Sequence, residues 1–245
     1  RNFEEASLAL MPQLVYDRFV KGYTEKQWGV PASSLSPTLA TRFDVRQNDD
    51  PRLTTHKYQG LPLDGYALLM EHMLSGIPVV LNCDYLRYRG ELRYRKLLVF
   101  TGPIDEFYGY RFGTLQYRGQ RREHHYVPHV GYAQPCGQVN NPDPGEGPHI
   151  RTLEWKHMMP PEYASQITGT VLTTEVAISP TESNNYEYPF PSEANLTLYK
   201  QYRNHSAIDQ DVLICGRLGE YRYYDMDHAI ARAMTLYSRI VATSA

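Results

Sequence analysis

The densest grouping of residues suited to ligand binding runs from Phe19 to Gly29. Three aromatic residues, Phe19, Tyr23 and Trp28, alternate there with hydrogen-bonding side chains such as that of Thr24. Flat aromatic faces stack on a base or a sugar at low entropic cost. The segment therefore fits a pocket for a base or a sugar, and it equally fits an ordinary helix that stops at Gly29.

A second grouping, Tyr221 to Met226, follows the glycines of Gly216 to Gly219. Small residues allow the backbone to approach a ligand closely. Asp225 and Asp227 stand where the last predicted helix begins, so a capped helix start is the alternative interpretation.

Two arginines lie in unlike settings. Arg46 belongs to a polar stretch between Arg42 and Lys57, and Arg151 heads a predicted strand. Guanidinium groups place paired hydrogen bonds on phosphate oxygens, which makes both arginines candidate phosphate ligands. Their spacing does not show that they converge, and exposed surface arginines are the alternative. Phe100 to Asp105, a strand followed by a Gly-Pro turn and an acid, suits either a cofactor contact or a plain turn.

Composition narrows the function classes. The 245 residues carry a formal net charge of -2, without the basic surplus that nucleic-acid binding requires. Three cysteines without a CxxC pair argue against a disulfide framework and suit the cytoplasm. No apolar run is long enough to span a bilayer. His124, His125 and His129 sit in a predicted exposed segment, so we expect no metal site.

The elements that must position these residues form an α+β fold. Helical spacing recurs over residues 2–28, with an interruption near Pro12, and further helices are predicted at 66–74, 195–202 and 227–242. Strands are predicted where apolar and β-branched residues cluster between turn residues: 79–81, 96–100, 111–118, 131–140, 151–156, 171–178 and 211–215. Few helices separate these strands, which favours a mostly antiparallel sheet flanked by helices.

A Rossmann fingerprint, G-x-G-x-x-G at the start of a helix, occurs nowhere in the chain. The chain also begins with Arg1 instead of a methionine, and we expect it to be a processed or excised piece.

Taken together, the motifs resemble the UDP-galactopyranose mutase family, across almost the whole chain. The segments that carry the resemblance occur in the family's order, and they are 21–29 (KGYTEKQWG), 58–66 around Tyr58-Gln59-Gly60, 101–105 (TGPID), Arg151 with Glu154, Lys156 and His157, Gly216-Arg217-Leu218, and 221–226 (YRYYDM).

The resemblance implies roles for individual residues. The positions matching the uridine pocket, with Tyr23 against the uracil, are Phe19, Tyr23, Thr24 and Trp28. Arg46 matches the mobile-loop arginine and Arg151 the fixed one, which together hold the diphosphate. Polar groups around the diphosphate and galactose match Tyr58, Asn140, Tyr188 and Tyr223. Positions near the flavin match Arg217, Asp225 and Met226. The excess of tyrosine, 21 residues, would supply neutral hydroxyls for such a ligand.

The resemblance further implies an isomerase that interconverts UDP-galactopyranose and UDP-galactofuranose for polysaccharide biosynthesis. In the family, N5 of reduced FAD forms an adduct with the anomeric carbon, UDP leaves, and the sugar ring recloses through another hydroxyl. The implied partners are UDP-galactose and UDP-galactofuranose, the implied cofactor is FAD, and a homodimer is one assembly that the family allows.

The chain departs from the family in three ways. The glycine-rich FAD-binding unit is absent, 140–150 is about one residue longer, and His149 replaces a tyrosine. We therefore expect the remnant of a three-domain FAD-dependent mutase, divided into the end of the helical domain (1–45), a mobile loop (46–56), an antiparallel substrate domain (57–190) and a return to the FAD domain (191–245).

Two alternatives stay open. One is a non-catalytic UDP-sugar-binding module, because the chain has the segments that match the UDP-sugar pocket but lacks the dinucleotide-binding loop. An amine-oxidase-type flavin oxidoreductase is the other alternative, although hydride chemistry does not require the segment from Phe19 to Trp28. We expect the isolated chain to be colourless and inactive.

Overall fold

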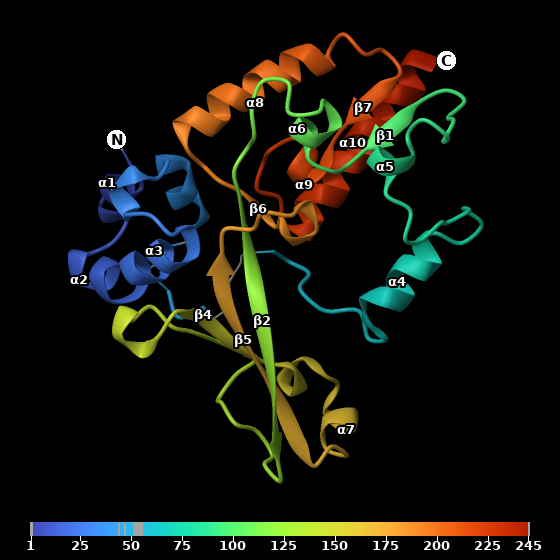
Figure 1. Cartoon of the computed structure of the whole chain (residues 1–245). Coiled ribbons are helices and arrows are strands. Elements are labelled where there is room, and N and C mark those ends of the chain that lie inside the picture. Colours follow the sequence, from blue (N-terminus) through green and yellow to red (C-terminus); the bar gives the residue numbers. More distant parts are fainter. Residues whose placement is uncertain (1, 44, 47, 51–55, 245) are drawn as a thin grey trace. The chain divides into compact units, whose positions relative to one another are not determined.

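The computed structural model describes residues 2–43, 45–46, 48–50 and 56–244 (Figure 1). The chain forms two compact units. Unit 1 combines Arg1–Cys83 with Arg121–Ala177, and unit 2 combines Asp84–Gln120 with Ile178–Ala245. Each unit is thus built from segments that are far apart in the sequence.

Unit 1 begins with short helices, as the apolar spacing predicts. The side chain of Asn2 caps the first helix by accepting a hydrogen bond from the amide of Glu5 (2.9 Å), and Pro12 separates this helix from the next. The helical segments in the N-terminal part of unit 1 are α1 (Phe3–Leu8), α2 (Gln13–Val15), the π-helical η1 (Tyr16–Lys21), α3 (Gly22–Trp28), the 3₁₀ turns η2 (Ala32–Ser34) and η3 (Pro37–Arg42), and α4 (Gly65–Met73).

A five-stranded sheet has the order β3-β4-β5-β2-β6. Its β3–β4, β4–β5 and β2–β6 pairs are antiparallel, which confirms the predicted mostly antiparallel sheet. The strands are β2 (Tyr117–Pro128), β3 (Gln138–Asn140), β4 (His149–Glu154), β5 (Gly169–Ile178) and β6 (Tyr188–Pro189). Short helical segments connect them: η4 (Pro144–Glu146), η5 (Trp155–Met158), α7 (Pro161–Ala164) and η6 (Ser183–Asn185).

Unit 2 holds the longer helices and a two-stranded parallel sheet. β1 (Leu98–Phe100) pairs with β7 (Val212–Ile214). The helices are α5 (Tyr85–Tyr88), α6 (Ile104–Phe107), α8 (Glu193–Ser206), α9 (Gly216–Gly219) and α10 (Met226–Ser244). The predicted helices near the C-terminus are therefore confirmed.

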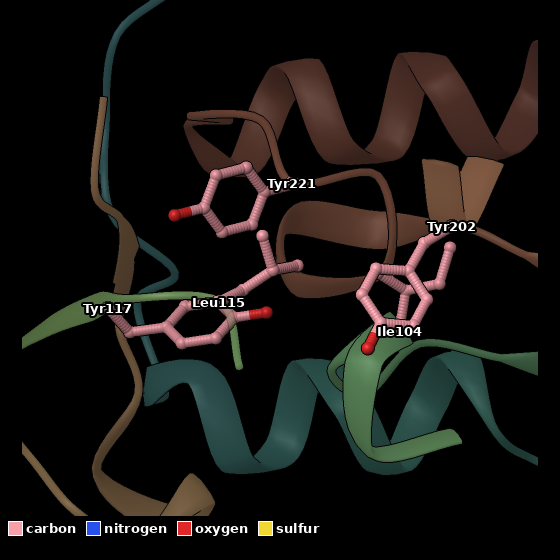
Figure 2. Packing of buried hydrophobic residues seen from close by; sticks show 5 residues of the cluster. All are labelled: Ile104, Leu115, Tyr117, Tyr202 and Tyr221. Atoms are coloured by element: carbon pink, nitrogen blue, oxygen red, sulfur yellow. The ribbon is translucent and has the colours of Figure 1, made fainter. Parts of the chain in front are cut away.

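Tyrosines form much of the core of unit 2 (Figure 2). Tyr117, Tyr202 and Tyr221 pack with aliphatic residues, and the hydroxyls of Tyr202 and Tyr221 donate to backbone carbonyls. The Tyr202 hydroxyl donates to the Gly113 carbonyl (2.7 Å), and that of Tyr221 donates to the Gln116 carbonyl (2.5 Å). Part of the tyrosine excess therefore satisfies buried backbone, which corrects its attribution to ligand binding alone.

Asp105, in the TGPID motif, is fully buried in unit 2. It accepts hydrogen bonds from the Leu115 amide (2.8 Å) and the Tyr117 hydroxyl (3.3 Å). Burial raises the pKa of its carboxyl, and the hydrogen bonds oppose that shift. The acid of this motif thus organises the core.

Several strand predictions are wrong. Residues 79–81 form no strand, and the side chains of Val80 and Leu81 are about four-fifths exposed (77% and 78%). In 111–118 the chain turns at Gly113 (φ 117°), so β2 starts only at Tyr117. Within 131–140 only β3 is extended. β propensity alone does not make a strand where no neighbouring strand supplies hydrogen bonds.

Candidate functional site

Helix α3 presents the predicted uridine-pocket residues. Gly29, with a left-handed φ of 70°, ends the helix, and its amide donates to the Glu25 carbonyl (2.8 Å). Thr24 and Trp28 are buried on one row of the helix and Tyr23 is half-buried, whereas Phe19 on η1 is 64% exposed. Tyr23 and Phe19 are therefore the two aromatic groups of this set with substantial surface.

Arg151 on β4 belongs to an ionic cluster around a buried carboxylate, and the cluster spans three strands of unit 1. The Glu175 carboxylate on β5 accepts from Arg122 on β2 through Oε1 (2.9 Å) and from Arg151 through Oε2. The Glu175 side chain is only 3% exposed, whereas those of Arg151 and Arg122 are 21% and 40% exposed. The buried carboxylate therefore fixes two cations that still reach solvent.

Asn140 joins this cluster through strand register. It lies opposite Arg151 in the β3–β4 ladder, and Arg151 lies opposite Glu175 in the β4–β5 ladder. Directly opposed residues share one face of a sheet. The structure thus brings two predicted site residues, Asn140 and Arg151, to one face.

Residues 140–150, in which the resemblance implies about one extra residue, lead into this cluster. The β4–β5 ladder is irregular between His149 and Arg151. The His149 ring lies beside the amide of Asn141, with 3.1 Å between Nε2 and Nδ2. An extra residue is commonly absorbed in such a local bulge.

Unit 2 carries a second cluster of predicted residues. The Tyr188 and Tyr223 rings stack with centroids 5.3 Å apart, and the Arg217 guanidinium lies 5.2 and 5.0 Å from them. Arg217 donates to the Tyr224 carbonyl from Nε (2.8 Å) and Nη2, and to the Glu187 carbonyl from Nη1 (3.0 Å). These bonds fix a cation beside two phenol groups, which suits phosphate and sugar oxygens.

The other predicted residues are Arg46 and Tyr58 in unit 1, and Asp225 and Met226 in unit 2. Arg46 pairs with Asp50 (3.3 Å), and Tyr58 is 82% exposed. Much of the predicted mobile loop, residues 47 and 51–55, lies outside the described residues. Asp225 is exposed just before α10, and Met226, the first residue of that helix, is 57% exposed.

Three motif residues around the end of β4 hold unit 1 together. Glu154 accepts hydrogen bonds from the Ala133 and Gln134 amides (2.9 Å each). Burial alone would raise the pKa of Glu154, yet these bonds and the neighbouring His157 hold it below its ordinary value. Lys156 donates to the Ile167 carbonyl (2.6 Å). Glu154, Lys156 and His157 thus act within the fold.

A cavity of about 320 Å³ lies elsewhere in unit 1, between β2, β5 and η5. Aromatic side chains such as Tyr126 and Trp155 line it, and none of the predicted site residues does. In the described part of the chain, no His, Cys, Asp and Glu residues form a group of three or more that could hold a metal ion. None of the helices described is both long and apolar enough to cross a membrane.

Glu175 and Arg122 are the site residues that sequence reasoning missed. Burial alternates along β5, with Thr173 at 0% and Glu175 at 2% exposure. A carboxylate on the buried row of a strand requires a partner, because an isolated buried charge is costly. The charge of Glu175 among the residues of a predicted strand was therefore the feature of the sequence that could have identified it. Its partners could not be identified in this way, because they depend on the order of the strands in the sheet.

Comparison with known proteins shows to which family the chain belongs. The model of the UDP-galactopyranose mutase family matches residues 18–223. The chain is 32% identical, over 96% of its length, to a probable UDP-galactopyranose mutase of Klebsiella pneumoniae, and 30% identical, again over 96%, to dTDP-fucopyranose mutase of Escherichia coli. It spans 59% and 62% of these two relatives.

A crystal structure of reduced UDP-galactopyranose mutase has the same fold, with a TM-score of 0.71 at 16% identity over 99% of this chain and 67% of that one. With a family model that covers most of its length, the chain belongs to the UDP-galactopyranose mutase family.

Proposed function

We propose that the protein containing this chain interconverts UDP-galactopyranose and UDP-galactofuranose. The observation that carries the proposal is Arg151, a cation fixed by a buried carboxylate and packed in the same unit as α3. Changing the ring size of a nucleotide-linked sugar requires the bond between the anomeric carbon and the diphosphate to break. Negative charge then grows on the diphosphate, and a fixed guanidinium stabilises that charge.

Each segment has a role in this proposal. Tyr23 stacks on the base, with Phe19, Thr24 and Trp28 forming the rest of the uridine pocket. Asn140 and Arg151 hold the diphosphate, and Arg46 adds a second cation from the loop that follows the helical segment. Tyr58, Tyr188 and Tyr223 bind sugar and phosphate oxygens through their hydroxyls.

FAD is the cofactor of the proposal, and the residues of unit 2 fit part of it. Arg217 uses three of its five N–H groups on backbone carbonyls, which leaves donors for phosphate or ribityl oxygens. The exposed Asp225 offers a carboxylate to hydroxyl groups, and Met226 offers an apolar contact. When bound, reduced FAD supplies the nucleophile for the anomeric carbon.

The Escherichia coli relative supports a second candidate substrate, a dTDP-linked 6-deoxyhexose. The chain is almost as similar to this relative as to the one from Klebsiella pneumoniae. Competition between UDP-galactose and dTDP-fucose for the whole protein separates the two candidates.

Turnover by the whole protein, supplied with FAD and a reductant, tests the proposal. Arg151→Ala is expected to reduce conversion of UDP-galactopyranose by a factor of about 100 or more, because the diphosphate loses a fixed charge. Arg121→Ala is the matched control, since this β2 arginine is 60% exposed and pairs with Glu123 at the surface. Equal activity of the two variants would remove Arg151 from the proposed role.

The proposal also includes a cytoplasmic location and assembly as a homodimer. The division into helical, loop, substrate and FAD-domain segments at residues 1–45, 46–56, 57–190 and 191–245 belongs to it as well. A non-catalytic UDP-sugar-binding module would bind the nucleotide sugar without converting it, and an oxidoreductase would change the redox state of its substrate.

A further inference from the structure

One face of α3 is fastened to the loop between β3 and β4. The Lys26 ammonium donates to the backbone carbonyls of two loop residues, Asn141 (3.1 Å) and Asp143 (2.6 Å), and to that of His149 (3.2 Å), the first residue of β4. An ammonium group has three N–H donors, so these contacts can use all of them. Because Asn141 and His149 stand at opposite ends of the loop, one side chain ties both ends to the helix.

Gly22 brings the helix backbone close to the same loop. It lies one turn before Lys26 on the same row of α3. A Cβ atom at this position would lie 2.0 Å from the Pro142 carbonyl oxygen and 3.3 Å from Pro144 Cδ. Only a residue without a side chain allows this approach.

The loop itself is stiffened by local hydrogen bonds. The Asp143 amide donates to the Asn141 side chain (3.2 Å), and the Gly145 amide donates to the Asp143 side chain (2.7 Å). The backbone amide of Asn141 donates to the backbone carbonyl of Ile150 (2.8 Å), and the Ile150 side chain is fully buried. A displacement of either end of the loop therefore passes to the strands that it joins.

Those strands carry the diphosphate residues of the proposed site. Asn140 is the last residue of β3, immediately before the loop, and Arg151 follows Ile150 in β4. Tyr23 lies on α3 between Gly22 and Lys26. The contact of α3 with the loop thus links the helix that carries Tyr23 to the strand that carries Arg151.

We propose that Gly22 and Lys26 are positioning residues. They hold Tyr23 and Arg151 at the distance that separates the base from the diphosphate within one nucleoside diphosphate. The inference rests on the proposed function, because it assigns a purpose to the spacing of that site. Neither residue is required to touch the ligand. Loosening the contact is expected to weaken binding that needs base and diphosphate together, and to spare binding of the base alone.

A double-mutant cycle on the whole protein tests this inference, with UDP and uridine affinities measured by calorimetry. Arg151→Ala in the wild-type background is expected to weaken UDP binding by about 10- to 100-fold, the range of a charged hydrogen bond. Lys26→Met is expected to weaken UDP binding by about tenfold and uridine binding by less than about twofold. In the Lys26→Met background, the additional substitution Arg151→Ala is expected to weaken UDP binding by less than about threefold.

Two further variants complete the design. Lys200→Met, at an exposed position of α8, is the matched control and is expected to leave both affinities unchanged. Gly22→Ala displaces the loop while keeping the Lys26 ammonium, and it replaces Lys26→Met if that variant does not fold. It is expected to show the same loss of UDP affinity with uridine binding retained.

The outcomes separate this inference from the proposed function. Additive effects of Lys26→Met and Arg151→Ala, or parallel losses of UDP and uridine affinity, would overturn the positioning role while leaving the UDP site intact. Absence of UDP binding by the wild-type protein would overturn the proposed function, and the inference with it. Non-additive losses confined to UDP would support both.

Discussion

Replacing the buried carboxylate of Glu175 by an amide should destabilise unit 1 and release the Arg151 side chain. Glu175→Gln keeps the shape of the residue but removes its charge. Its amide oxygen still accepts from one arginine, whereas its NH₂ group faces the other. The variant therefore loses one charge-assisted hydrogen bond in a site where the carboxylate is 3% exposed.

The structure sets the expected magnitude. A hydrogen bond to a charged group contributes about 1.5–3 kcal/mol, and a half-lost buried ion pair costs more. Arg122 is 40% exposed and Arg151 is 21% exposed, so water partly solvates the released cation. We expect a loss of about 2 kcal/mol in the free energy of unfolding, which corresponds to a decrease in Tm of about 4–8 °C.

Urea and thermal denaturation of the 245-residue chain measure this loss. Glu123→Gln is the matched control, because Glu123 makes a surface ion pair with Arg121 and is 49% exposed. That substitution should change stability by less than about 0.5 kcal/mol. The reasoning is refuted if both variants unfold at the same urea concentration.

Two other predictions concern residues that hold the fold. The stability that Glu154 contributes is complete above its ordinary pKa of 4.5 and is lost as the pH falls through its lower folded pKa. The stability difference between wild type and Glu154→Gln, measured by urea denaturation, should therefore shrink below about pH 4. A difference that does not change with pH would contradict the stabilising role of the ionised Glu154 carboxylate. Tyr221→Phe should cost about 1–2 kcal/mol because the Gln116 carbonyl loses its hydroxyl donor. The matched change Tyr199→Phe should be nearly neutral, and equal thermal unfolding of these two variants would exclude the Tyr221 hydrogen bond as a stabilising contact.

Local patterns predicted the elements that depend on local interactions. The helix over 227–242 appears as α10, because it has a clear apolar period. The strand over 171–178 appears as β5, because it is rich in β-branched residues. β2 was largely missed, since its polar and charged residues gain strand structure only from neighbouring strands. The parallel pairing of β1 with β7 joins residues more than 100 positions apart, which no local pattern specifies.

The candidate site was predictable in its residue types but not in its contacts. Resemblance of motifs identified Arg151 and Asn140, and strand register placed them opposite each other. Glu175 could be suspected from a charge on the buried row of its strand. Its pairing with Arg122 required the order of β5 and β2 in the sheet. The contacts of Lys26 with backbone carbonyls leave no sequence pattern, because any residue supplies a carbonyl.

The structure of the whole protein bound to UDP-galactose tests the central claim most directly. The account predicts that diphosphate oxygens lie within hydrogen-bond distance of the Arg151 guanidinium, about 2.7–3.0 Å, with the uracil against Tyr23. Arg151 should keep its contact with Glu175 in that complex. A diphosphate bound away from Arg151, with the base distant from α3, would contradict the account.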